Sequence, residues 1–191
     1  MATPQTAHLF ITTGPESCGK TTLAQALSAE WQAPLVSEAA RAYLHRRFEQ
    51  DGHFRYHQAD LTAIAGEQYA LEQEALQQPV PFVVCDTDLL VILVWSEVKY
   101  GNVDPVITEL FTRSIATTRR TYLLCDFHVP WEPDPLREDP DNRAELFARY
   151  RDKLDHYGLD YRVVTGDVPA RLALVNELTS SSGGGCPCCI D

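Results

Sequence analysis

Eight residues near the start of the chain have the types and spacing that bind a polyphosphate. Residues 14–21 read GPESCGKT and match the pattern G-x-x-x-x-G-K-[ST] without a mismatch. In such a loop, backbone N–H groups surround the anion, the lysine reaches the β- and γ-phosphates, and the hydroxyl ligates Mg²⁺. We predict a catalytic role for Lys20 and a metal-binding role for Thr21. The residues expected to bind ATP are Gly14, Glu16, Ser17, Cys18, Gly19, Lys20, Thr21 and Thr22.

Two acidic residues stand where phosphoryl transfer requires carboxylates. Asp86 follows four apolar residues at 82–85, the pattern of a second nucleotide-binding motif whose carboxylate holds Mg²⁺. Glu38 follows a short strand-like stretch at 34–37 and could orient or deprotonate an attacking hydroxyl. We predict Asp86 as metal ligand or general base, and Glu38 as a catalytic residue that also contacts the substrate. The alternatives are the ordinary acidic end of a buried strand and a surface acid at a helix start.

A polar, proline-rich connection at about residues 128–143 is predicted to be a lid. A connection of this length inside a compact domain usually has a function. Arg137 and Arg143 lie in it, and mobile guanidinium groups can close over the charge that spreads across a transferred phosphoryl group. We predict both arginines to be catalytic, the alternative being solvated surface charges.

Four further residues are candidate substrate contacts. Asp88 could accept a hydrogen bond from a substrate hydroxyl or, equally, cap the helix that follows it. Arg41 lies one helical turn after Glu38 and could pair with that residue or with phosphate. Tyr43 and Trp131 are the aromatic candidates, and Trp131 stands out because a tryptophan in a polar loop has little core to join.

Apolar patterning places these residues on alternating strands and helices. Strand-like runs occupy residues 8–12, 34–37, 82–86, 121–126 and 161–164. Helical patterns follow each run, with Asp60 expected to cap one helix and Asn142 and Glu145 expected to form a reciprocal cap on another. The pattern predicts an α/β fold, a P-loop NTPase three-layer sandwich with a five-stranded parallel sheet and a lid segment. The strands of such a sheet end at one edge, where ligands bind.

Length and composition limit the classes of protein and of partner. The chain has 191 residues and a net charge of −11, which would repel a phosphate-rich polymer, so no nucleic-acid partner is expected. Residues 1–7 lack a secretory pattern, and the longest apolar run, 89–95, is too short to cross a bilayer. We expect a cytoplasmic protein with no membrane partner and a small-molecule substrate. The oligomeric state stays open.

The cysteines fall into two groups that suggest the domain boundary. Cys18, Cys85 and Cys125 lie in the loop and in two strand patterns, where reduced, partly buried thiols are expected. The other three follow a Ser/Gly run near the carboxyl end, which is typical of a flexible segment. We predict one kinase domain over residues 1–179 and a flexible tail over residues 180–191.

Several motifs occurring in order resemble the kinase domain of the NadR-type ribosylnicotinamide kinases. These are GPESCGKTTL at 14–23, the Glu-x-x-Arg-x-Tyr pattern from Glu38, Asp-Leu-x-x-Ile-Ala at 60–65, and Cys-Asp-Thr-Asp at 85–88. Pro-Trp at 130–131, Leu-Arg at 136–137 and Asn-Arg at 142–143 complete the set, which spans about residues 8–178. Members of this family often carry an aromatic residue just before the glutamate of Glu-x-x-Arg-x-Tyr, where this chain has Ser37.

The resemblance implies phosphorylation of the 5′-hydroxyl of nicotinamide riboside by ATP with Mg²⁺, giving nicotinamide mononucleotide. The flat pyridinium cation of that substrate could stack on Trp131 or Tyr43, and Asp86, Asp88 or Glu38 could bind the ribose. The chain has no His-x-Gly-His motif, so the adenylylation carried out by full-length members is not expected. Two alternatives remain: a kinase of another nucleoside or small metabolite, and an ATP-binding regulatory domain without turnover.

Overall fold

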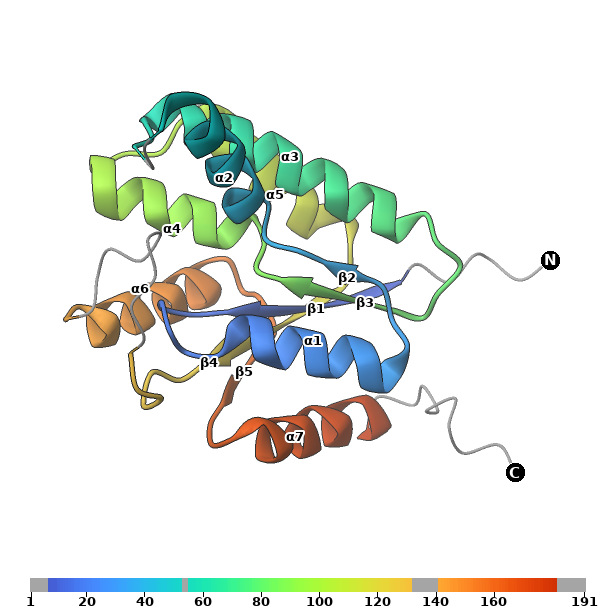
Figure 1. Ribbon diagram of the computed structural model, residues 1–191. Helices are drawn as coiled ribbons and strands as arrows, with labels where there is room; N and C mark the ends of the chain where they lie inside the picture. The colour runs from blue at the N-terminus through green and yellow to red at the C-terminus, as the bar shows by residue number, and fades with distance from the viewer. Residues whose placement is uncertain (1–6, 53–54, 132–140, 182–191) are drawn as a thin grey trace.

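The computed structural model describes residues 7–52, 55–131 and 141–181, and within these ranges its centre is a five-stranded parallel sheet (Figure 1). The strands follow the order β2–β3–β1–β4–β5 across the sheet. Their bounds are β1 His8–Thr13, β2 Leu35–Val36, β3 Phe82–Asp86, β4 Arg120–Cys125 and β5 Tyr161–Val164. The predicted α/β class and parallel sheet are confirmed.

Alternation along the strands divides the buried side chains between two cores. Leu9 and Ile11 of β1 face one core, together with Val83 and Cys85 of β3, whereas Phe10 faces the other. β1 pairs with β3 and β4 in parallel register, so that residues at matching positions share a face. A sheet buried on both faces requires helices on both, and this accounts for the three layers.

The helices complete the two outer layers (Figure 1). α1 and α7 lie together below the sheet as drawn, and their apolar residues Leu23, Leu27 and Val175 join the smaller core. The other helices supply the larger core on the opposite face. Their bounds are α1 Lys20–Trp31, α2 Ala39–Asp51, α3 Gln58–Leu76, α4 Leu89–Tyr100, α5 Pro105–Thr117, α6 Arg143–His156 and α7 Val168–Ser181.

Two predicted helix caps are wrong in detail. The cap of α3 is His57, and the Asp60 carboxylate, three positions further on, accepts a hydrogen bond of 2.7 Å from the His57 backbone N–H. Asp60 therefore forms the second half of a capping box, and the helix begins three residues earlier than a cap at that position would place it. Asn142 is the N-cap of α6 but makes no side-chain cap hydrogen bond, and Glu145 accepts a hydrogen bond from Arg149 one turn later.

Some predicted segments lie outside the described residues. Most of the lid, including Arg137, falls in residues 132–140, and most of the tail falls in residues 182–191. Among the residues that are described, no helix is both long enough and apolar enough to span a membrane. The apolar run at 89–95 begins α4, where Leu89, Leu90 and Leu93 are fully buried in the larger core.

Candidate functional site

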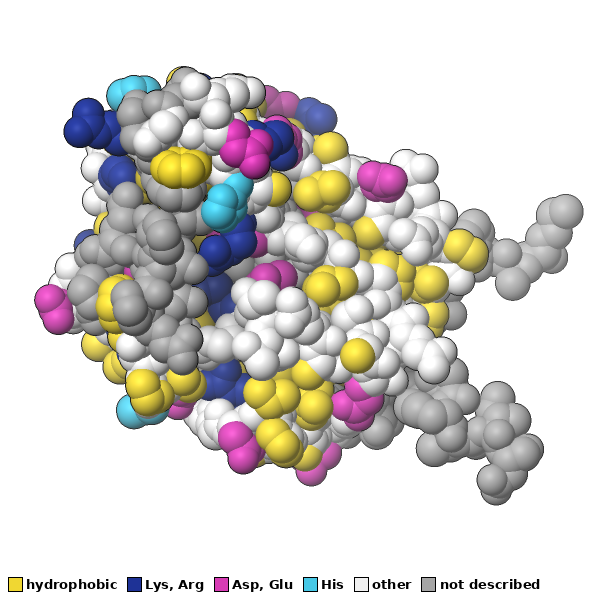
Figure 2. Space-filling model, in the orientation of Figure 1, with side chains coloured by type: hydrophobic (Ala, Val, Ile, Leu, Met, Phe, Trp, Pro, Cys, Tyr) yellow, Lys and Arg dark blue, Asp and Glu magenta, His cyan; other side chains and the backbone are white. Residues whose placement is uncertain are grey.

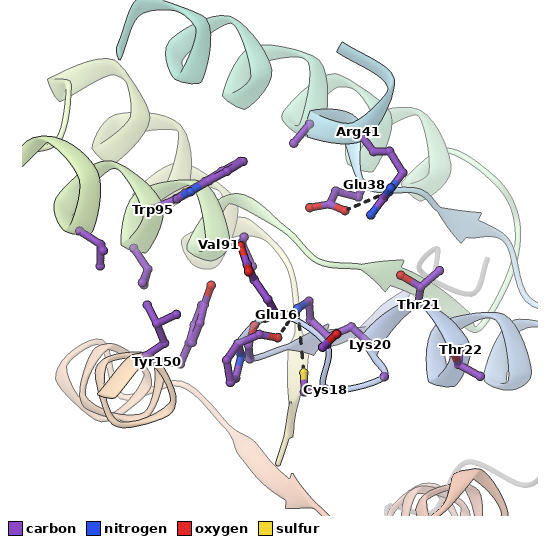
Figure 3. A pocket seen from close by; sticks show the side chains of 18 of the residues that line it. Glu16, Cys18, Lys20, Thr21, Thr22, Glu38, Arg41, Val91, Trp95 and Tyr150 are labelled. Atoms are coloured by element: carbon purple, nitrogen blue, oxygen red, sulfur yellow. Dashed lines mark hydrogen bonds and ion pairs between the residues drawn. The ribbon is translucent and has the colours of Figure 1, made fainter. Parts of the chain in front are cut away.

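A pocket opens at the edge of the sheet where β1 ends, and the predicted phosphate loop forms its floor (Figure 3). Residues 14–22 lie on one side, and side chains of α2, α4 and α6 complete the wall. All these elements leave or approach the carboxyl ends of the strands, the edge at which parallel α/β proteins bind ligands. Beyond the loop, the lining residues are Glu38, Ala40, Arg41, Leu44, Val91, Val94, Trp95, Val98, Leu146 and Tyr150.

The loop requires glycine at its first position. Gly14 has φ +131°, and a Cβ there would lie 2.7 Å from the Cys125 carbonyl oxygen, closer than side chains tolerate. The loop consequently packs directly against the end of β4. The same packing buries the thiols of Cys18 and Cys125, which are free together with Cys85, as predicted.

Lys20 crosses the interior of the loop. Its Nζ donates to the Gly14 carbonyl at 3.0 Å and to the Pro15 carbonyl at 2.6 Å (Figure 3). Burial opposes the charge, but the neighbouring Cys18 and Glu38 outweigh it and raise the pKa of Lys20 above its ordinary value. The ammonium group is therefore charged at neutral pH and placed to bind an anion held by the loop.

Asp86 ends β3 next to the loop, and it is not one of the residues that line the pocket. Burial raises the pKa of its carboxyl group, and this effect is partly offset by the Thr21 hydroxyl and by the charge of Lys20. Its Oδ1 atom is buried and has no hydrogen-bond partner among the described residues. A hard cation such as Mg²⁺ prefers oxygen ligands of this kind. The Asp86 carboxylate and the Thr21 hydroxyl therefore fit the predicted metal site.

A strained residue separates the two acids of this motif. Thr87 adopts φ +68°, a left-handed conformation that is rare for a β-branched residue, and its N–H donates to the Thr12 carbonyl at 3.1 Å. This sharp turn leaves Asp86 beside Thr21 and sends Asp88 into the protein interior. Strain of this sort persists where the surrounding structure enforces it, and it is common at functional sites.

Glu38 and Arg41 line the pocket opposite the loop, as the sequence predicted. They pair at 4.0 Å across one turn at the start of α2 (Figure 3). The charge of Glu38 helps to raise the pKa of Lys20, the residue beside which the terminal phosphate is expected. This carboxylate can accept a proton from a hydroxyl bound there.

Arg143 contacts the phosphate loop from the first turn of α6. One of its guanidinium nitrogens donates to the Ser17 carbonyl at 3.2 Å and to the Val129 carbonyl at 2.8 Å. It therefore joins the loop to the first residues of the predicted lid. The predicted role of Arg143 in neutralising transferred phosphate remains a prediction, since here the group binds backbone.

Asp88 caps α4, which is the second of the two roles that the sequence allowed for it. Its side chain is 0% exposed, accepts from the Leu90 N–H at 3.0 Å and from the Tyr122 hydroxyl at 2.6 Å, and pairs with Arg120 at 3.3 Å. A carboxylate with these partners is not available to a substrate hydroxyl. The prediction of Asp88 as a substrate contact is therefore wrong in this structure.

Two predicted aromatic contacts are also not part of the pocket wall. The Tyr43 hydroxyl donates to Asp60 at 2.8 Å, which ties α2 to α3. Trp131 is partly buried at the end of the described segment and is likewise absent from the lining. The aromatic residues that do line the pocket are Trp95 of α4 and Tyr150 of α6, and Val91 lies between them (Figure 3).

The sequence contained a signal for Trp95 that was not used. Val91, Val94, Trp95 and Val98 recur at spacings of three and four residues, so they form one face of α4 next to the more deeply buried leucine face. Tyr150 had no comparable signal, since it lies on the apolar face of α6 with Leu154. Burial raises the pKa of Tyr150, so its phenol is neutral.

Acidic and basic side chains lie together in this site, since Glu16, Lys20, Glu38 and Arg41 all line the pocket. Although the chain carries a net charge of −11, the face shown in Figure 2 has several Lys and Arg side chains along a recessed band near its middle. These cations attract an anionic ligand to an otherwise acidic protein, although carboxylates lie beside them.

Beneath the pocket, a second acid beside Asp88 gives a prediction on stability. Glu72 of α3 is fully buried, accepts from the Ser114 hydroxyl at 3.2 Å, and burial together with the nearby Asp88 raises its pKa from 4.5 to about 8. The folded state thus binds this proton more tightly than the unfolded state. The contribution of Glu72 to stability is complete below pH 4.5 and is lost as the pH rises to about 8.

We expect Glu72→Gln to remove this pH dependence, because glutamine keeps the shape of the protonated acid. Urea unfolding at several pH values between about 5 and 8 should show the variant gaining stability relative to the wild type as pH rises. The control is Glu109→Gln, an exposed glutamate paired with Arg113. A constant difference between Glu72→Gln and the wild type across this range would contradict the assignment.

Comparison with known proteins places this geometry in a family. A family model described as an AAA domain matches residues 9–171, which is most of the chain. Among curated proteins no significant match is found. Two solved structures of NadR protein resemble the chain at 21% and 20% identity, with TM-scores of 0.68 and 0.71. One is in complex with NAD and AMP-PNP, and the other with NR.

The lengths covered differ between these neighbours. The NadR matches cover 94% and 93% of this chain, but the chain spans only 50% and 52% of theirs. A deoxyadenosine kinase from M. mycoides, at 16% identity and TM-score 0.58, is covered to 99% of its length by a match over 91% of this chain. A shikimate kinase from Aquifex aeolicus has 14% identity and TM-score 0.52, with 93% of this chain and 99% of that one covered. These likenesses establish the fold, which is that of P-loop kinases.

Proposed function

The chain belongs to the AAA domain family, and from this premise we propose that it is an ATP-dependent kinase acting on the 5′-hydroxyl of a nucleoside, nicotinamide riboside. The products are nicotinamide mononucleotide and ADP, a reaction of NAD biosynthesis. The observation that carries the proposal is one pocket with two unlike ends. A phosphate loop with a charged lysine forms one end, and an apolar compartment with two aromatic side chains forms the other.

The polar end accounts for phosphoryl transfer. The loop amides and Lys20 would hold the triphosphate, and Thr21 and Asp86 would hold Mg²⁺, which would neutralise part of the phosphate charge. The substrate hydroxyl oxygen attacks the γ-phosphorus, the bond to the β–γ bridging oxygen breaks, and ADP leaves. Glu38 is the group we assign to accept the hydroxyl proton, because it lines the pocket whereas Asp86 lies below it.

The apolar end accounts for the acceptor. Trp95 and Tyr150 offer aromatic faces, and valines of α4 with Leu44 and Leu146 complete the wall. A flat ring with few hydrogen-bonding groups suits such a wall, and a pyridinium cation gains further attraction from aromatic faces and from the nearby Glu16 and Glu38. Nicotinamide riboside has these properties. The bound ligands named for the NadR structures support this choice of substrate. The nucleoside substrate of the deoxyadenosine kinase supports the broader class of nucleoside kinases.

The proposal is tested by ADP release with a panel of acceptors. Nicotinamide riboside, adenosine, cytidine, their deoxy forms and shikimate are compared at equal concentration with Mg·ATP. We expect nicotinamide riboside to give the highest kcat/KM. A higher kcat/KM for a deoxynucleoside would contradict the proposed substrate but would leave the proposed reaction class intact. Tight ATP binding without turnover of any acceptor would instead favour a regulatory ATP-binding domain.

A substitution at Trp95 tests the aromatic end of the pocket. In Trp95→Leu the KM for the nucleoside should rise about tenfold to a hundredfold, because ring contact and cation attraction are lost, while the KM for ATP stays unchanged. Steady-state kinetics with each substrate varied in turn measures both constants. Tyr43→Leu is the matched control, since Tyr43 lies away from the pocket wall and binds Asp60. Equal effects of the two substitutions would contradict the placement of the acceptor.

A further inference from the structure

A buried arginine of the last helix supports the phosphate loop from behind. Arg171 lies in α7, which runs beside α1 below the sheet (Figure 1). Its side chain is only 3% exposed. Its Nη1 donates to the Cys18 carbonyl at 2.7 Å, and its Nε donates to the Gly166 carbonyl at 3.0 Å. Its other terminal nitrogen lies 3.6 Å from Asp126. One guanidinium group therefore joins the loop to two other segments that end at this edge of the sheet.

The contact with the Cys18 carbonyl fixes the direction of the next N–H. No peptide bond among the described residues is cis, and in a trans peptide the C=O and N–H groups point in opposite directions. Because the Cys18 carbonyl points to Arg171, the Gly19 N–H points away from it, toward the side of the loop where Lys20 and the pocket lie. A hydrogen bond from a cation to the carbonyl also polarises the peptide and makes that N–H a stronger donor.

The fit at this contact is close. Gly19 adopts φ +83°, and a Cβ at this position would lie 3.2 Å from Nη1 of Arg171. The guanidinium group thus occupies the space directly behind the Cys18–Gly19 peptide. Asp126 at the end of β4, itself hydrogen-bonded to His128, holds the far side of the group.

The electrostatic environment of the loop agrees with this geometry. Burial would raise the pKa of Cys18, but the hydrogen bond with Cys125 and the charges of Lys20 and Arg171 lower it to about 6. The positive potential from Arg171 thus reaches into the loop, where it adds to that of Lys20. Two cations on opposite sides of one loop favour an anion inside it.

We propose that Arg171 is a positioning residue for the triphosphate, which aims the Gly19 N–H and adds charge without touching the ligand. The inference rests on the proposed function in that the loop must bind a triphosphate. It gives α7 a role beyond covering the sheet, because the loop of residues 14–21 is completed by a residue of the last helix.

The test is the Arg171→Lys variant, which keeps the charge but cannot reach the two carbonyls and Asp126 together. Dissociation constants for Mg·ATP and for magnesium tripolyphosphate, which has no base or sugar, are measured by calorimetry. Both should rise about tenfold or more, since charge-assisted hydrogen bonds are lost, while the KM for the nucleoside stays within about twofold. Arg162→Lys is the matched control, because Arg162 is exposed on β5 and pairs with Asp160.

A second variant keeps the test decisive if Arg171→Lys does not fold. Asp126→Asn leaves the guanidinium in place but weakens its anchor, so both phosphate ligands should bind at least about threefold more weakly. Unchanged tripolyphosphate binding in the folded variant would overturn the inference and leave the proposed function intact. Equal losses for tripolyphosphate and nucleoside would also overturn it, since they indicate general distortion. A wild-type protein that binds no ATP would instead remove the proposed function.

Discussion

Lys20→Ala should lower the rate of phosphoryl transfer by about a hundredfold to a thousandfold while the protein stays folded. The ammonium group is the charged donor inside the loop, and a single preorganised donor at a site of developing charge contributes about 10²–10³ in rate. Its loss also leaves the Gly14 and Pro15 carbonyls without their donor, so the loop should bind ATP more weakly. Single-turnover measurement of nucleotide product separates the chemical step from binding.

The matched control is Lys153→Ala. Lys153 pairs with Glu97 at 2.5 Å and does not line the pocket, so its removal should leave turnover unchanged. Circular dichroism and thermal unfolding of both variants show whether the fold is intact. A folded Lys20→Ala protein with near wild-type turnover would mean that the loop does not hold the reacting phosphate.

Asp86→Asn should also lower turnover strongly, by about 10²–10⁴, and the loss should depend on Mg²⁺. An amide keeps the size of the side chain but removes the charge of a carboxylate whose buried Oδ1 has no partner among the described residues. Raising the Mg²⁺ concentration should recover part of the activity of the variant, whereas the wild type is saturated. The measurement is the Mg²⁺ concentration at half-maximal rate for each protein.

The control for this second prediction is Asp152→Asn, an exposed acid on α6. Its Mg²⁺ dependence should match that of the wild type. If Asp86→Asn kept both its rate and its Mg²⁺ requirement, Asp86 would have no catalytic role. It would then be the ordinary acidic end of a buried strand. Glu38 would then remain as the acid closest to the reacting groups.

The arrangement of strands and helices could be predicted because short stretches of the sequence determine each of these elements. Runs such as residues 82–86 are apolar and bounded by proline and aspartate, and the order of strand, loop and helix around residues 14–21 leaves little choice of fold. The same reasoning predicts the places of the phosphate loop, Asp86 and Glu38, since each follows a strand and must lie at the same edge of a parallel sheet.

Residues whose role depends on distant partners could not be predicted in this way. Asp88 looked available, but Arg120 and Tyr122 of β4 bind it, and no local pattern pairs residues 88 and 120. Arg171 contacts the Cys18 carbonyl although it lies 153 positions later in the chain. Such contacts are decided by how helices pack on the sheet, and the sequence of one element does not contain them.

The aromatic wall of the pocket illustrates both cases. Trp95 belongs to a helical face that the spacing of α4 indicates, but which face meets the pocket depends on where α4 lies relative to α2 and α6. Tyr43 does not line the pocket as Ala40, Arg41 and Leu44 of the same helix do, and its hydroxyl binds Asp60 of α3. Choosing between two aromatic residues from sequence alone requires the tertiary packing that the structure supplies.

The central claim is that this loop binds a magnesium-bound triphosphate, and calorimetry with a non-hydrolysable ATP analogue and Mg²⁺ tests it most directly. The account predicts binding at one site on the native chain, competition by tripolyphosphate, and loss of binding in Lys20→Ala. Absence of any binding heat for the folded wild-type protein, or binding that Lys20→Ala leaves unchanged, would contradict it.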